Sequence, residues 1–313
     1  MSEVKIATRD SYGKALTELV RDHKDVVALD ADLAEATKSI ALRKAYPEHH
    51  FDCGIAEGNM VAAAAGLSTT GLVPFVSSFA MFATGRAFEQ IRNSIGYPHL
   101  NVKICASHAG ISVGEDGATH QCLEDIALMR TIPGMVVMCP ADDVEARAAV
   151  KAAYEHQGPV YIRTGRLAVP VFHDEATFHF EIGKGEEVVP GNDITIIATG
   201  LLVEEARKAA ATLKEEGISC RVINMATIKP LDKEIVIKAA KETGRIVTAE
   251  EHNIIGGLGE AVAACLAEEY PCKMVRVGVN DRFGTSGPAL ELLEKFGLCA
   301  SHLAEVCREF LKK

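Results

Sequence analysis

Short apolar runs alternate with longer stretches rich in Ala, Glu and Lys along the first half of the chain. The apolar runs are DVVALD, LVPFVSS, NVKICAS, GMVVMC and PVYIRT. Runs of this length that are rich in β-branched residues predict strands, and the longer stretches between them predict helices. Their regular alternation predicts a parallel sheet that is covered by helices.

The alternation stops after Pro170, in the polar segment VFHDEATFHFEIGKGEEVVPGND, which we interpret as a surface ribbon and linker that ends near residue 190. A second series of strand-like runs then follows. These runs are DITIIATG, SCRVINM, RIVTAEE and CKMVRVGV. We therefore predict two α/β domains, residues 1–185 and 186–313, each a doubly wound, mainly parallel sheet.

Composition excludes several classes of function. The chain has 313 residues, of which 48% are hydrophobic and 24% are charged, as expected of a soluble globular protein with two domains. A net charge of −10 argues against binding to nucleic acid or to an anionic membrane. The start MSEVKIATRD has no signal-peptide pattern, no apolar run is long enough to span a bilayer, and we expect a cytoplasmic protein. The nine cysteines form no C-x-x-C pair, which indicates neither a disulfide framework nor a zinc site.

The segment FDCGIAEGNMVAAAAGL places Glu57 between a strand-like stretch and an Ala-rich helix. A carboxylate at a helix N-terminus is common, because it complements the helix dipole. It can equally serve in proton transfer when small neighbours leave it as the only titratable group at that point. Both interpretations stay open on this segment alone.

The next segment, VPFVSSFAMFATGRAFEQIRNSI, reads as a strand followed by a helix that begins with Phe79 and Phe82. A spacing of three places both rings on one face of a helix. Such a pair is usually part of the core, but at a strand-to-helix corner it can also stack on a flat heterocycle.

The stretch ASHAGISVGEDGATHQCLEDIALMR carries His108, Asp116 and His120 in a Gly-rich loop between a strand and a helix. Such loops suit acid–base chemistry and recognition of hydroxyl groups, since Gly lets the backbone and a ligand approach closely. A loop held by its own hydrogen bonds is the structural alternative. A zinc site is disfavoured, because the spacing lacks the helical pairing of H-E-x-x-H.

Two arginines add positive charge near these segments. Arg9 stands at a predicted helix start, where a cation opposes the dipole, and Arg166 lies just beyond a strand, with Arg163 as its rival. We interpret them as candidates for holding an anionic ligand, although solvated arginines remain an alternative. The Gly-rich stretch EEHNIIGGLGE in the second domain reads best as a tight turn and helix start, and less well as an anion site.

Taken in order, the segments IAEGNM, SSFAMFATGRAFEQIRNS and SHAGISVGEDGATHQ resemble the C-terminal half of transketolases. The resemblance covers the chain from IATRDSYGKAL to FGTSGPALELLEKFGL. It implies a pyrimidine-binding domain for thiamine diphosphate, followed by a smaller C-terminal domain.

By this resemblance Glu57 is the catalytic glutamate, which hydrogen-bonds N1′ of the aminopyrimidine and so promotes deprotonation of thiazolium C2. Phe79 and Phe82 match the aromatic pair around the pyrimidine ring, with Phe82 the stronger candidate for direct stacking. Gly85 stands where some relatives carry a third aromatic residue, so this wall of the pocket is expected to be thinner.

The resemblance also implies a substrate site. His120 matches a residue that contacts the donor ketose and the reaction intermediate, and Asp116 matches the residue that reads the sugar C2 hydroxyl. The group His108, Arg9 and Arg166 matches the residues that hold the substrate phosphate.

A serine that often assists this phosphate group is replaced by Ala36, with Thr37 beside it. A further departure concerns the diphosphate. Full-length relatives bind it through Mg²⁺ with a G-D-G motif followed by Asn, and the sequence contains no such pattern. We therefore expect no metal site on this chain, and a large subunit that holds the Mg²⁺ and diphosphate in an α2β2 heterotetramer.

The sequence thus predicts the small subunit of a two-chain transketolase, which transfers a two-carbon ketol unit between sugar phosphates. The alternatives are the beta subunit of a 2-oxo acid dehydrogenase and a non-catalytic regulatory partner of an intact transketolase. The loop with Asp116 suits a polyhydroxylated donor better than pyruvate, and Glu57, Asp116 and both histidines argue against a non-catalytic role.

Overall fold

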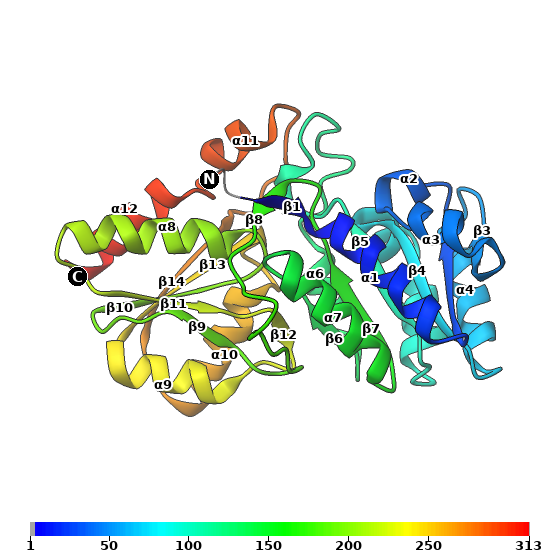
Figure 1. The fold of residues 1–313 in the computed structure, drawn as a ribbon. Helices are drawn as coiled ribbons and strands as arrows, with labels where there is room; N and C mark the ends of the chain where they lie inside the picture. Colours follow the sequence, from blue (N-terminus) through cyan, green and yellow to red (C-terminus); the bar gives the residue numbers. More distant parts are fainter. Residues whose placement is uncertain (1–3, 313) are drawn as a thin grey trace.

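The computed structural model describes residues 4–312, which form two helix-flanked β-sheets connected by a linker (Figure 1). The first sheet has seven strands, in the order β12 (Thr227–Lys229), β6 (Val136–Met138), β7 (Val160–Arg163), β5 (Lys103–Ser107), β4 (Val73–Phe79), β2 (Val26–Asp30) and β3 (His50–Asp52). All neighbouring strands in it are parallel except β12 and β6. This arrangement confirms the predicted α/β class.

Helices cover both faces of this sheet. They are α1 (Thr8–Asp22), α2 (Ala34–Thr37), α3 (Ile40–Ala45), α4 (Glu57–Ser68), α5 (Phe88–Gln90), α6 (Asp125–Arg130) and α7 (Asp143–Glu155), with short η1 (Pro47–His49), η2 (Met81–Arg86), η3 (Ile91–Gly96) and η4 (Ile111–Val113) segments. Strand residues alternate between the two faces, as the pleat requires. Val26 and Ala28 pack with α1 and α7, whereas Val27 and Leu29 pack with α4 and α6.

The second sheet has five strands, in the order β14 (Lys273–Val279), β13 (Arg245–Asn253), β10 (Ile194–Ala198), β11 (Cys220–Asn224) and β9 (Glu186–Val189). Its helices are α8 (Leu202–Glu215), α9 (Lys233–Thr243), α10 (Leu258–Glu269), α11 (Ala289–Lys295) and α12 (Ala300–Leu311). Buried residues of α8, α11 and α12 pack on one face, and those of α9 and α10 on the other. Only β9 runs antiparallel to its neighbour, and it occupies the end of the segment that we interpreted as a ribbon.

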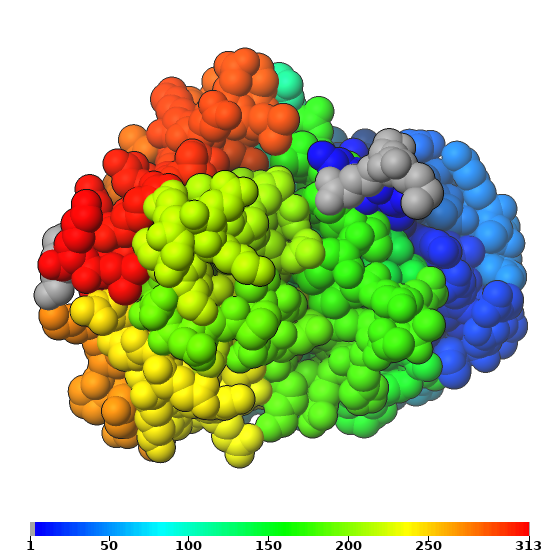
Figure 2. All heavy atoms as spheres, turned by 60° about the vertical axis from the view of Figure 1, so that its left-hand side comes forward, coloured from blue at the N-terminus to red at the C-terminus, as the bar shows by residue number. Residues whose placement is uncertain are grey.

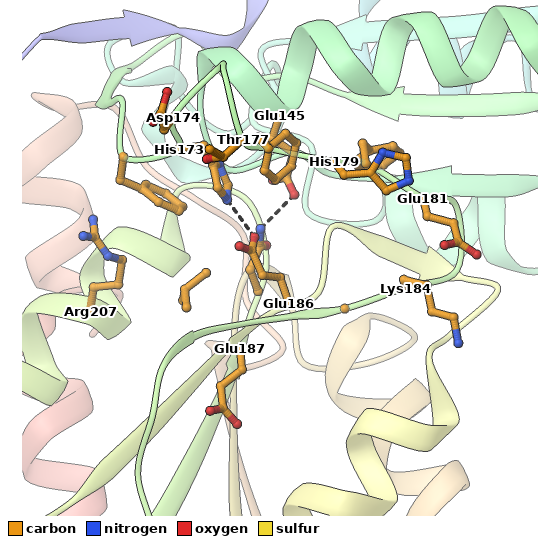
Figure 3. A pocket seen from close by; sticks show the side chains of 16 residues that line it. Glu145, His173, Asp174, Thr177, His179, Glu181, Lys184, Glu186, Glu187 and Arg207 are labelled. Carbon is orange, nitrogen blue, oxygen red and sulfur yellow. Dashed lines mark hydrogen bonds and ion pairs between the residues drawn. The ribbon is translucent and has the colours of Figure 1, made fainter.

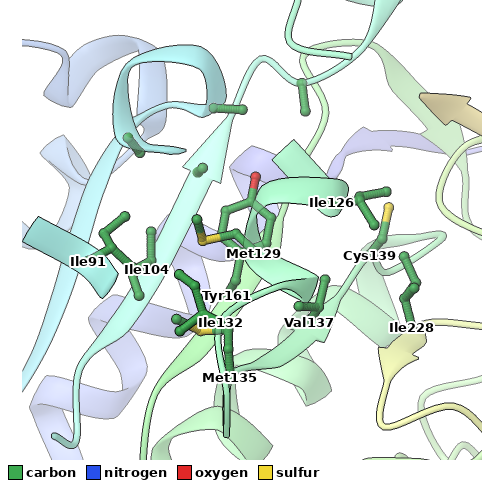
Figure 4. Packing of buried hydrophobic residues seen from close by; sticks show 14 of the residues in the cluster. Ile91, Ile104, Ile126, Met129, Ile132, Met135, Val137, Cys139, Tyr161 and Ile228 are labelled. Carbon is green, nitrogen blue, oxygen red and sulfur yellow. The ribbon is translucent and has the colours of Figure 1, made fainter. Parts of the chain in front are cut away.

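The two sheets share one continuous hydrophobic core. Strand β12 follows β11 in the chain, yet it pairs with β6 of the first sheet. Its Ile228 is 1% exposed and lies near Val137 and Cys139 (Figure 4). A further antiparallel pair, β1 (Lys5–Ala7) with β8 (Ala168–Pro170), ties the chain start to the end of the first series. The space-filling view shows the green middle of the chain between the blue and the yellow-to-red parts (Figure 2).

A cavity of about 610 Å³ lies between the linker and the second sheet (Figure 3). The linker residue His173, whose side chain is 5% exposed, donates from Nε2 to Glu186 Oε2 at 2.8 Å. Its Nδ1 lies 3.0 Å from Asp142 Oδ1, an ion-pair distance without hydrogen-bond geometry. Burial alone lowers the pKa of His173, but Asp142, Glu186 and the charge of Glu145 outweigh it and raise the pKa to about 9. His173 therefore links Asp142, at the N-cap of α7, to Glu186, at the start of β9.

We expect His173→Gln to destabilise the protein more at pH 6 than at pH 9.5. Because the folded state holds this proton more tightly than the unfolded state, the stabilisation is complete below the unfolded pKa of about 6.5 and is lost as pH rises through about 9. Since Glu186 is 47% exposed, the difference should be about 1–2 kcal/mol. Urea unfolding at both pH values measures it, and an equal loss at both would contradict the charged pairing.

Candidate active site

The predicted site residues gather beyond the carboxyl ends of the parallel strands of the first sheet. Glu57 follows β3, Phe79 ends β4, His108 follows β5 and Arg166 follows β7. Ligands bind at this edge in open α/β sheets, because the loops of neighbouring strands meet there. Residues distant in the sequence thus become neighbours, and Arg9 at the start of α1 lies within hydrogen-bond reach of His108.

Glu57 begins α4 and is 1% exposed. Its Oε2 accepts a hydrogen bond from Arg86 Nη1 at 2.7 Å, and its Oε1 accepts a longer one of 3.4 Å from Ser78 Oγ. We expected Glu57 to be the only titratable group at this helix start, but Arg86 also lies there. Arg86 stands four residues after Phe82, a spacing that could have indicated it.

Phe79 and Phe82 lie with their ring planes 18° apart and their centroids separated by 5.8 Å. Phe79 is the last residue of β4 and not, as predicted, the start of a helix, whereas Phe82 belongs to the π-helical segment η2. π-Helical turns are rare and often occur at functional sites. The guanidinium carbon of Arg86 lies 4.6 Å from the centroid of Phe82, a cation–π contact. Beside Gly85, the terminal methyl of Met81 fills the space that a side chain would occupy.

His108 stacks on Phe79, with ring centroids 3.8 Å apart. Its Nε2 lies 3.0 Å from Arg9 Nη1, which can only donate, so Nε2 accepts and Nδ1–H donates to Ser107 Oγ at 2.8 Å. Burial, followed by the charges of Arg9 and Arg166, lowers the pKa of His108 to about 3. The imidazole is therefore neutral near pH 7.

Three cations surround this histidine. Arg9 also donates from Nη1 to the Ala36 carbonyl at 3.0 Å, and burial lowers its pKa, with a smaller contribution from Arg166. Arg166 is paired with Glu115 at 3.1 Å and remains 38% exposed. Lys38 lies 3.4 Å from Asp10, and its charge also lowers the pKa of His108.

Sequence reasoning missed Lys38, although it follows Ala36 and Thr37 directly. Thr37 does not supply the hydroxyl of the missing serine, because it is fully buried and donates to Asp30 at 2.9 Å.

The loop after β5 brings His120 to the aromatic pair. Its ring lies edge-on to Phe82 at 5.3 Å and to Phe79 at 6.2 Å. Asp116 is exposed on the same loop, and its carboxylate takes no part in the contacts described above. The structure therefore unites six of the eight predicted residues by direct contacts or mutual charge effects. Glu57 is joined to them through Arg86, which contacts Phe82, and Asp116 lies on the loop that carries His120.

Two other candidates have structural roles. Arg163 is 5% exposed and is paired with Asp125 at 2.7 Å, so it is not a rival to Arg166 for a ligand. In the stretch EEHNIIGGLGE, the Glu250 carboxylate accepts hydrogen bonds from the backbone N–H groups of Leu258 and Gly259, at 2.7 and 2.8 Å. The start of α10 thus binds the chain's own carboxylate, which favours the structural interpretation of this turn.

None of the predicted site residues lines the cavity at the linker. Across residues 4–312, no group of three or more His, Cys, Asp or Glu side chains is arranged to hold a metal ion. Within the same range, no helix is long and apolar enough to cross a bilayer.

Comparisons with known proteins cover nearly the whole chain. Residues 4–171 match the family model of the transketolase pyrimidine binding domain, and residues 183–303 match that of the transketolase C-terminal domain. A protein of Methanocaldococcus jannaschii, named as a transketolase C-terminal section, is 50% identical over 100% of this chain and 99% of its own. A 6-deoxy-6-sulfo-D-fructose transketolase subunit of Clostridium sp. is 42% identical over 97% and 94% of the two chains.

Among solved structures, one titled split gene transketolase, inactive beta4 tetramer, aligns with a TM-score of 0.90. It is 50% identical and covers 99% of each chain.

Proposed function

Because the chain belongs to the transketolase family, we propose that it is the small subunit of a two-chain transketolase. In this proposal, it transfers a two-carbon ketol unit from a ketose phosphate to an aldose phosphate, as part of a cytoplasmic enzyme. The observation that carries the proposal is the buried carboxylate of Glu57 at a helix start, which is hydrogen-bonded to the Arg86 guanidinium that lies over the ring of Phe82.

The residues around Glu57 fit the aminopyrimidine of thiamine diphosphate. The contacts of Arg86 support this fit, because its guanidinium, like an aminopyrimidine, is a flat group with N–H donors. It hydrogen-bonds Glu57 at 2.7 Å and lies over Phe82 at 4.6 Å, which are the two contacts that a protonated or amino-substituted ring would make. The side chain of Arg86 is 51% exposed, so it can turn toward solvent when such a ring enters.

Thiamine diphosphate, when bound, supplies the carbon nucleophile that carries the two-carbon unit. The role of Glu57 is to hold and exchange a proton at Oε2, where burial excludes competing water. Phe82 supplies a stacking face, and Ser78 donates to Oε1 and keeps the carboxylate oriented.

The substrate end of the proposed site is cationic. Arg9, Arg166 and Lys38 surround His108, and together they suit a tetrahedral anion at the far end of a sugar. A neutral His108 accepts from Arg9 and so orients that guanidinium. We assign hydroxyl recognition to Asp116 and His120 from their place on the loop after β5.

Two kinds of anion, a phosphate and a sulfonate, fit these cations. The relative from Clostridium is named for a sulfonated sugar, and a sulfonate offers the same oxygen acceptors to arginine and lysine as a phosphate does. We propose sugar phosphates as substrates because Arg9, His108 and Arg166 match the residues that hold the substrate phosphate in the family that the sequence resembles.

A second polypeptide completes the proposed enzyme. The two matching family models describe the pyrimidine-binding and C-terminal domains, so we assign the diphosphate and its Mg²⁺ to a large subunit in an α2β2 assembly. The solved relative titled as a split gene transketolase supports this division.

Co-expression with a candidate large subunit tests the proposal. We expect the reconstituted complex to transfer ketol units from xylulose 5-phosphate and to show no oxidative decarboxylation of pyruvate. The purified chain alone should bind no thiamine diphosphate at micromolar concentration in the presence of Mg²⁺. Pyruvate decarboxylation by the complex, or tight cofactor binding by the chain alone, would refute the assignment.

A further inference from the structure

The loop that carries Asp116 and His120, residues 108–121, is held from outside by the second sheet. Glu251, on β13, accepts a hydrogen bond at its Oε1 from the backbone N–H of Ser112 at 2.5 Å. Its side chain is 3% exposed, and 139 positions separate it from Ser112. This hydrogen bond connects β13 of the second sheet to the loop that follows β5 of the first sheet.

Two glycines of the loop allow this approach. Gly110 has a φ of +83°, and a Cβ there would lie 2.3 Å from the carboxyl carbon of Glu251. Gly117 has a φ of +74°, and a Cβ there would lie 2.4 Å from Ser286 Oγ. We interpreted these glycines as making room for a ligand, but they make room for the C-terminal part of the chain.

Gln121 forms a second connection across the same boundary. Its Nε2 donates to the carbonyls of Thr285 at 2.9 Å and Ile111 at 3.1 Å, and its side chain is 3% exposed. One amide group thus joins the two ends of the loop to the segment before α11. The hydrogen bond from Ser112 to Glu251 is buried and that from Gln121 to Thr285 is partly buried. In such surroundings, a lost partner leaves an unpaired polar group.

Glu251 is itself held in position. Arg163 donates from Nη2 to the backbone carbonyl of Glu251 at 2.8 Å, and Arg163 and Asp125 are the charged groups that face its carboxylate. Burial raises the pKa of Glu251 to about 7, opposed by Arg163 and the hydrogen bond from Ser112. A buried carboxyl group is costly unless its bonds are made, so its one backbone donor is a specific contact.

We propose that Glu251 is a positioning residue, through which the C-terminal domain holds the 108–121 loop in the conformation that presents Asp116 and His120 to the sugar. This inference rests on the proposed function. The carboxylate touches no reacting atom, and it acts through the backbone of Ser112.

Glu251→Met and Glu251→Gln test the proposal, with Glu250→Met as the matched control. Met keeps the length of the side chain without an acceptor, whereas the Gln carbonyl can still accept from Ser112. Glu250 is equally buried on the same strand but caps α10, away from the loop. Hydrogen exchange of residues 108–121 in the full chain, and KM and kcat of the reconstituted complex, are the measurements.

We expect Glu251→Met to speed exchange in the loop and to raise KM for the donor sugar, each by about tenfold or more, with a smaller change in kcat. Glu251→Gln should stay within about threefold of wild type in both. Glu250→Met should lower stability without changing either quantity. Unchanged loop exchange and KM in Glu251→Met, or equal changes in both Met variants, would overturn the proposal.

If Glu251→Met does not fold, Gln121→Leu tests the second connection with the same measurements and the same expectation. Hydrogen exchange of the loop can be measured in the full chain whether or not the complex is active. A wild-type complex without ketol transfer would therefore refute the proposed function, while the exchange data would still decide the role of Glu251.

Discussion

Glu57→Gln should lower the ketol-transfer rate of the reconstituted complex by about 10²–10⁴-fold and leave assembly intact. The carboxylate is 1% exposed, and its Oε2 faces a flat N–H donor group beside Phe82. A carboxamide keeps the shape and the acceptor oxygen, but it cannot exchange a proton at that atom. Steady-state kinetics and size-exclusion chromatography of the complex measure the two parts of this prediction.

Glu145→Gln is the control for this substitution. Glu145 also lies in the first turn of a helix, is 3% exposed and accepts from Asn224 at 2.8 Å, but it lines the cavity at the linker. We expect its variant to keep full turnover. Undiminished activity of Glu57→Gln, or an equal loss in both variants, would show that Glu57 has no special part in the chemistry.

Arg163→Met should destabilise the chain by about 3–5 kcal/mol. The substitution leaves Asp125, which is fully buried, without its cation. Although burial alone raises the pKa of Asp125, Arg163 holds it below the usual range, so the carboxylate stays charged near pH 7. Arg163 also donates to the Glu251 carbonyl, so the loss weakens the contact between the two parts of the chain. Urea unfolding at pH 7 measures the change.

Arg308→Met gives the matched comparison. Arg308 forms an ion pair with Glu216 at 2.6 Å, but both side chains are more than one third exposed. Water screens such a pair, and its removal should cost much less. If Arg163→Met lost no more stability than Arg308→Met, the buried pair would not have the structural role that we assign to it.

Most strands of the two sheets could be predicted because they run through a buried layer, whereas β9, which has no buried residue, was interpreted as part of the ribbon. Strand β4, for example, is buried at all seven positions, and apart from two serines its residues are apolar. Local pattern also places Glu57 at the start of α4 and Arg9 in the first turn of α1. The prediction that Phe79 begins a helix was wrong, because the local pattern does not separate the last residue of a strand from the first turn of a π-helical segment.

Contacts between distant segments could not be predicted from the sequence. Nothing in the three residues of β12, TIK, predicts that this strand pairs with β6 of the first sheet although it follows β11 of the second sheet in the chain. The contact of Arg86 with Glu57 spans 29 positions, and that of Glu251 with Ser112 spans 139. Such pairs depend on how whole elements pack, and periodicity within one element carries no information on them.

The sequence by itself determined most of the succession of strands and helices, the family resemblance and most of the residues proposed for the site, because these depend on local pattern and on motif order. Only the tertiary structure decided which arginine is buried with Asp125, which group pairs with Glu57, and why the loop before His120 is rich in glycine. The physical reason is that burial and charge pairing are properties of the packed chain. Where two segments of the packed chain approach closely, only residues that fit the space can stand on each of them.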